Sequence, residues 1–270
     1  MKLSNIFSHR NRALLRELVV TEFKLRYQGS ALGFMWSLFR PLFLFGILLV
    51  VFGFILKVGS DIEHYPIYLL LGIVLWSFFV EATNTGLQSI VGRGDLIRKI
   101  NFPKYIIVIS GTISALINLG ISLIVVGVFM YFSNVQLRPE ALLFPLIIVE
   151  IYILALALAF FLAALYVKYR DITHMWELIL QAAFYGTPIL YPVSLVLEKS
   201  PELAKALLLN PMAQIVQDAR YVLITPQTDT LFGLTQNWLL VLTPIAVVGV
   251  TILAAAYYFS KSSKYFAENV

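Results

Sequence analysis

The stretch of sequence that decides the fold class is residues 141–167, ALLFPLIIVEIYILALALAFFLAALYV, in which Glu150 is the only charged side chain. In an α-helix, which rises about 1.5 Å per residue, this stretch is longer than the ~30 Å hydrocarbon layer of a bilayer. Inside that layer no water hydrogen-bonds the backbone, so a crossing segment must satisfy its own backbone groups. The stretch therefore predicts a transmembrane α-helix.

Comparable apolar runs cover residues 31–56, 66–90, 105–132, 176–197 and 238–259. Apolar residues make up 60% of the chain and charged residues only 13%, whereas a soluble protein of this size carries about 25% charged residues to keep its surface wet. We therefore predict an all-α integral membrane protein with six transmembrane helices and a single domain over residues 1–270.

The fifth run is the least regular, because Gly186, Pro188 and Pro192 interrupt it. Such residues break or kink a helix, and a bilayer tolerates the break only where protein or a water-lined cavity satisfies the freed backbone groups. The loop that follows, residues 198–237, contains two amphipathic segments. We expect this loop to be partly re-entrant at the membrane edge.

The distribution of basic residues predicts the orientation. Six crossings place both termini on one side, and that side holds Lys2, Arg10, Arg12, Arg16, Lys24, Arg26, Arg93, Arg98, Lys99, Lys104, Lys168, Arg170, Lys261 and Lys264. The other side holds Lys57, Arg138, Lys199, Lys205 and Arg220. Since Lys and Arg collect on the cytoplasmic side, both termini are predicted to be cytoplasmic and residues 198–237 to lie outside. The net charge of +5 then reflects contact with lipid headgroups and indicates no nucleic-acid partner.

Two cytoplasmic segments carry apolar side chains at helical spacing. Residues 12–27, with Leu14 and Leu18 on the apolar side, predict a helix that lies in the membrane interface; the alternative is an extension that only anchors the topology. Residues 95–102 predict a short helix capped by Asp95, with an apolar face that would lie exposed at a wet surface. Such a face usually marks a partner site.

Five segments in chain order resemble the permeases of the polysaccharide and polyol-phosphate ABC exporter family, the type 2 ABC transporter membrane subunits that export O-antigen, capsule or teichoic acid chains. They are YQGSALGFMWSL at residues 27–38 with Arg40 and Pro41 after it, LIRKINFP at 96–103, KYRDI at 168–172, PILYP at 188–192 and LNPM at 209–212. The similarity extends from about residue 12 to residue 260.

This resemblance implies a half-transporter in the bacterial cytoplasmic membrane. The family's active unit is a homodimer of permease chains with two separate ATP-binding cassette subunits. The sequence has no G-x-x-x-x-G-K-[ST] phosphate loop, so ATP is expected to bind the partner subunit, and the chain itself needs no cofactor. The residues expected to dock the ATPase are Leu14, Leu18, Leu96, Ile97, Arg98, Ile100 and Phe102.

The resemblance also implies a substrate path for a lipid-linked glycan between the two permease copies. Its predicted residues are Trp36, Arg40, Phe184, Tyr185 and Tyr191. Aromatic rings suit sugar C–H bonds, although packing is the ordinary role of any single ring. A charge at membrane depth is costly, so Arg40 is expected either to meet a substrate phosphate or to pair with a glutamate.

Two other classes of function stay open at this point. Glu81 and Glu150 lie within predicted crossings and could form a proton relay, which would indicate a proton-coupled secondary transporter. A membrane-embedded transferase is the less favoured alternative. His9, His64 and His174 lie on different loops without metal-ligand spacing, and the chain has no cysteine. We therefore predict no catalytic residue and no metal site.

Overall fold

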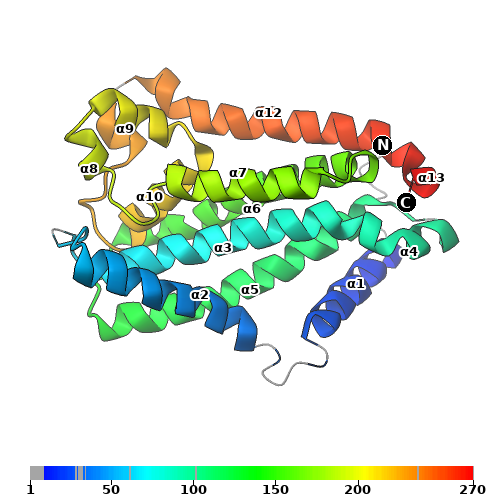
Figure 1. Ribbon diagram of the computed structural model, residues 1–270, viewed down its shortest axis with the longest axis horizontal. Coiled ribbons are helices and arrows are strands. Elements are labelled where there is room, and N and C mark those ends of the chain that lie inside the picture. Colours follow the sequence, from blue (N-terminus) through cyan, green and yellow to red (C-terminus); the bar gives the residue numbers. More distant parts are fainter. Residues whose placement is uncertain are drawn as a thin grey trace.

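The computed structural model, shown in Figure 1, describes residues 9–27, 29, 33, 35–60, 62–100, 102–235 and 237–269, and within these ranges the chain is helical without strands. The α-helices are α1 His9–Tyr27, α2 Met35–Leu48, α3 Tyr65–Ser89, α4 Gly94–Lys99, α5 Tyr105–Phe132, α6 Phe144–Lys168, α7 Ile172–Gly186, α8 Ser194–Leu197, α9 Pro201–Leu208, α10 Pro211–Leu223, α11 Leu231–Leu234, α12 Trp238–Ser262 and α13 Phe266–Asn269. A π-helix η2 covers Leu49–Ile55, and 3₁₀ turns cover η3 Val91–Arg93, η4 Pro139–Leu143 and η5 Ser263–Tyr265.

Five helical stretches are long and apolar enough to cross a membrane. They are Met35–Ile55, Tyr65–Ser89, Tyr105–Phe132, Pro139–Lys168 and Trp238–Tyr265. The remaining predicted crossing, the fifth apolar run, contains α7, whose 15 residues span only about 22 Å as a helix. The structure thus confirms an all-helical membrane protein, and the count of six crossings stays a prediction. The predicted start of the first crossing, at residue 31, lies outside the described residues.

Helix α3 forms the centre of the bundle. In its most apolar window 78% of the residues are buried, against 11% in α2 and η2 and 17% in α12. It contacts α2, α5, α6, α7 and α10, and glycines allow the closest of these approaches. A Cβ atom at Gly86 would lie 2.3 Å from Cβ of Ala159 on α6, and one at Gly111 on α5 would lie 2.8 Å from Cγ2 of Thr85. Small residues at such positions let membrane helices pack closely.

The short helices gather at the two ends of the bundle. Figure 1 shows α4 and α13 at one end, with α1 beside them, and α8, α9 and α10 at the other. Helix α7 extends between these ends beside α3. We call the end with α1, α4 and α13 the coupling end and the opposite one the outer end.

The fifth apolar run breaks as predicted. Helix α7 ends at Gly186, and Thr187 takes an extended conformation ahead of Pro188. By contrast, the prediction that Asp95 caps the short cytoplasmic helix is wrong. Arg93 occupies the N-cap position of α4 without a side-chain hydrogen bond, and Asp95 lies in the first turn, where a carboxylate favours the helix dipole instead.

Candidate functional site

An apolar cluster holds the coupling end together. It contains Leu18 of α1, Ile97 of α4, Phe102, and Phe266 of α13, together with residues of α5, α6 and α12, and Leu14 packs against it. Helix α1 lies along α5, and α4 contacts α13. The apolar side of the predicted interface helix therefore packs largely on the chain itself.

The prediction of one exposed apolar face on residues 95–102 is wrong. Ile97 is only 4% exposed and Phe102 is buried as well, because α4 has few turns and packs against α13. Ile100 is 52% exposed, and Arg98 is also exposed. Docking of the ATPase stays a prediction for the seven residues named in the sequence analysis. Among those in or next to α4, Arg98 and Ile100 are the most exposed and therefore the most accessible to a partner.

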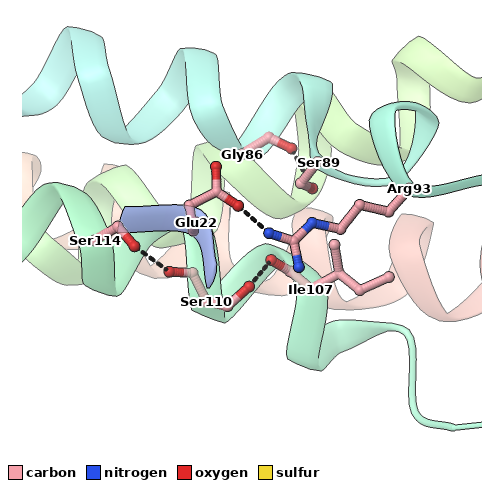
Figure 2. Close-up of polar contacts among 7 residues, drawn as sticks. All are labelled: Glu22, Gly86, Ser89, Arg93, Ile107, Ser110 and Ser114. Atoms are coloured by element: carbon pink, nitrogen blue, oxygen red, sulfur yellow. Dashed lines mark hydrogen bonds and ion pairs between the residues drawn. The ribbon is translucent and has the colours of Figure 1, made fainter. Parts of the chain in front are cut away.

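An ion pair joins α1 to the turn ahead of α4. Figure 2 shows the guanidinium of Arg93, at the end of η3, directed at the carboxylate of Glu22 on α1. The two side chains are 18% and 24% exposed, respectively. Below them in Figure 2, Ser110 and Ser114 donate to carbonyls one turn earlier in α5. The ion pair therefore connects α1, which also lies along α5, to the turn that leads into α4.

The predicted path residues fall into two groups. Trp36 and Arg40 lie one turn apart on α2 and are exposed, and Tyr185 on α7 is also exposed. Phe184, in contrast, packs partly buried against Trp76 of α3, with ring centroids 5.8 Å apart. Tyr191 is half-buried, and its hydroxyl donates to the carbonyl of Tyr185 at 3.0 Å. Trp36, Arg40 and Tyr185 are thus exposed, whereas Phe184 and Tyr191 contact neighbouring segments of the chain, and their role in a substrate path stays a prediction.

Helix α7 carries a polar stripe that the sequence prediction missed. His174, Glu177, Gln181 and Tyr185 are all exposed, and their spacing of three, four and four residues places them on one side of a helix. The opposite side packs inward through Trp176, whose indole N–H donates to Oγ1 of Thr83 at 3.2 Å. The spacing of three, four and four residues between these polar side chains is the signal in the sequence that could have predicted the stripe.

The intramembrane charges do not form the predicted pairs. Arg40 has no ion-pair partner within the described ranges. Glu81, in the C-terminal half of α3, accepts a hydrogen bond from Nδ2 of Asn118 at 2.7 Å. Glu150, in the second turn of α6, lies beside Gln214 and Asp218 of α10. The two glutamates therefore lie at different depths with separate neighbours.

The sequence prediction also misplaced Arg220, which it counted as a cation of the outer loop. The structure buries Arg220 completely, with 0% exposure, beneath α3 and the break after α7. Its position depends on contacts between distant parts of the chain, and no local pattern signals it.

Together these features define a multi-pass membrane protein whose polar groups face outward along α2 and α7. The family model described as ABC-2 type transporter matches residues 13–224. The chain belongs to this family, as the five sequence segments predicted.

Named relatives agree with this assignment. The chain is 29% identical over 262 residues to the O-antigen export system permease protein RfbA of Myxococcus xanthus, and the alignment covers 96% of both chains. Two proteins of the same name from Klebsiella pneumoniae are 27% and 25% identical, over 75% of this chain and 77% of their own lengths.

Proposed function

We propose that two copies of this chain form the membrane part of an exporter that moves lipid-linked polysaccharide of the O-antigen type across the bacterial cytoplasmic membrane. Two separate ATP-binding cassette subunits bind and hydrolyse ATP for it, and the chain itself catalyses no reaction. The names of the relatives support the substrate class, and the family supports the ATPase partner.

The observation that carries the proposal is the polar stripe on α7. A carboxylate and an amide that face hydrocarbon are costly, so polar groups in membrane helices usually face protein or water. Glu177 and Gln181 point away from the rest of their own chain. A second copy that presents the same stripe would enclose a polar path between the two chains.

Helix α2 supplies the opposite wall of that path. Figure 1 shows α2 and α7 on either side of α3, and both contact it. The exposed guanidinium of Arg40 suits a phosphate of the lipid carrier. The exposed rings of Trp36 and Tyr185 suit the apolar faces of sugars, which favours a chain that slides through without tight binding.

The coupling end is where ATP hydrolysis by the partner subunit would act on the chain. We place this end, and both termini, in the cytoplasm, where the ATPase would contact the exposed Arg98 and Ile100. A proton relay finds little support, because Glu81 and Glu150 lie at different depths with separate neighbours.

Transport in inverted membrane vesicles that contain the chain and its ATPase tests the proposal. Uptake of the lipid-linked polymer should require ATP and continue when an uncoupler collapses the proton gradient. Glu81→Gln and Glu150→Gln should leave the ATP requirement intact. Uptake that an uncoupler abolishes at constant ATP would exclude the exporter and indicate a secondary transporter.

Within the same vesicles, Gln181→Leu tests the polar stripe. It should slow export at least about fivefold, which corresponds to ~1 kcal/mol, because it removes a polar group from the path. The matched control is Ile179→Ala, at an exposed position of the same helix that lies off the polar stripe, which should transport normally. Equal rates for both variants would remove α7 from the path.

A further inference from the structure

The break after α7 leaves three buried carbonyl groups in succession, those of Pro188, Ile189 and Leu190. Irregular backbone inside a protein makes no helical hydrogen bonds, so its carbonyls need other donors, and unsatisfied ones are strongly destabilising away from water. Here the donors are side chains. The hydroxyl of Tyr65 donates to the carbonyl of Leu190 at 2.8 Å, and the other two carbonyls accept from Arg220.

Arg220 joins three elements through one guanidinium group. Nη1 donates to the carbonyl of Pro188 at 2.5 Å and Nη2 to that of Ile189 at 2.7 Å. Nε donates to the carbonyl of Tyr68 on α3 at 3.0 Å. The side chain thus connects α10, which carries it, to α3 and to the break in the fifth segment.

The surroundings of Arg220 fit its planar head group. The guanidinium carbon lies 3.5 Å from the ring centroid of Tyr68, and Oε1 of Gln217 accepts from Nη1 at 2.8 Å. Gly72 leaves the space that the group occupies, because a Cβ atom there would lie 2.5 Å from Nη2. None of the partners that the described residues provide is a carboxylate, so carbonyl dipoles and an aromatic face stabilise this buried charge.

We propose that Arg220 is a positioning residue for transport, which holds the break at 188–190 against α3 and thereby fixes Tyr185 and Tyr191 at the outer end of the path. These two tyrosines flank the break, and the hydrogen bond from the Tyr191 hydroxyl to the Tyr185 carbonyl closes over it. The role depends on the fork of donors and not on charge alone, since a lysine ammonium cannot reach three carbonyls in one plane. This inference rests on the proposed export function only for its effect on transport.

Thiol labelling in this naturally cysteine-free chain tests the position of the break directly. Ile189→Cys places a reporter thiol between the two carbonyls that Arg220 binds, and Ala204→Cys, buried in the separate cluster of α9, provides the control. With Arg220 present, an impermeant maleimide should label neither thiol in membranes. Adding Arg220→Lys should raise the labelling rate of the thiol at position 189 at least about tenfold and leave the thiol at position 204 protected.

A second variant keeps Arg220 and fills part of the space that its guanidinium group occupies. Gly72→Ala should expose the reporter thiol at position 189 in the same way, whereas Gly127→Ala, where a Cβ atom meets open space, should not. In vesicles, complexes that contain Arg220→Lys or Gly72→Ala should still hydrolyse ATP through the partner ATPase but export less polymer per ATP.

Two results would overturn the inference. One is a reporter thiol at position 189 that stays protected in both Arg220→Lys and Gly72→Ala; the other is full export per ATP by variants in which that thiol is labelled. The labelling needs neither ATPase nor substrate, so a wild-type chain that fails to export would contradict the proposed function while the position of the break is still measured.

Discussion

At the coupling end, Arg93 meets a carboxylate from α1 and remains 18% exposed, whereas at the outer end Arg220 is fully buried and binds carbonyls and an amide oxygen. A partly exposed ion pair contributes little stability, is screened by salt, and can separate and reform. A buried guanidinium that satisfies several carbonyls cannot be withdrawn without leaving them unpaired. The comparison indicates a coupling end whose contacts can change during a transport cycle and an outer end whose break is held firmly.

The largest expected effect is that of Arg220→Ala. Each buried carbonyl left without a donor destabilises the fold by about 1–3 kcal/mol, so the loss should reach at least about 3 kcal/mol. Thermal unfolding in detergent should show a midpoint lower by roughly 6–12 °C, at ~2–4 °C per kcal/mol. Lys205→Ala, which removes a partly exposed cation of α9, should leave the midpoint unchanged. Equal unfolding midpoints for the two variants would contradict the conclusion that Arg220 stabilises the outer end.

The next largest effect on stability is expected for Ile97 of α4, and its exposed neighbour Ile100 is expected to affect ATPase binding instead. Ile97→Asp places a carboxyl group in the apolar cluster and should destabilise the chain by about 2–3 kcal/mol. Ile100→Asp alters an exposed position and should leave stability intact while it abolishes co-purification of the ATPase. Normal co-purification by a well-folded Ile100→Asp variant would remove α4 from the docking surface.

The smallest effect is expected for the ion pair of α1. A double-mutant cycle with Glu22→Gln and Arg93→Gln should give a coupling energy of about 0.5–1 kcal/mol that decreases as salt is raised. The more exposed pair of Glu202 and Lys205, with nitrogen and oxygen 3.4 Å apart, is the matched control and should give less. A salt-independent coupling above about 2 kcal/mol would mean that the coupling end is held as firmly as the outer one.

Much of the fold could be predicted because its signals are local. An apolar run long enough to cross a bilayer predicts a helix whatever surrounds it, and Gly186 with Pro188 predicts the break at the right place. The family segments predicted the ABC-2 type transporter family in the same way. The bounds of the short helices and the partners of their side chains depend on distant parts of the chain.

The candidate site shows where local signals fail. Ile97 is buried in an apolar cluster to which α13, from the other end of the sequence, contributes Phe266, so apolar spacing alone did not predict which side of α4 is exposed. Arg220 lies in an amphipathic segment of the outer loop, where a basic residue normally faces water. Only the three-dimensional contact with Pro188 and Ile189 distinguishes it from the other outer cations.

The distance in sequence between Arg220 and the carbonyls that it binds also sets an order of events during biosynthesis. Pro188 and Ile189 precede Arg220 by 32 and 31 residues, which a ribosome adds in roughly 2–6 s. During that interval the fifth segment is already made, but its break has no guanidinium to satisfy it. A nascent chain released before α10 would lack the guanidinium, and the carbonyls of Pro188 and Ile189 would lose the donors that stabilise the break.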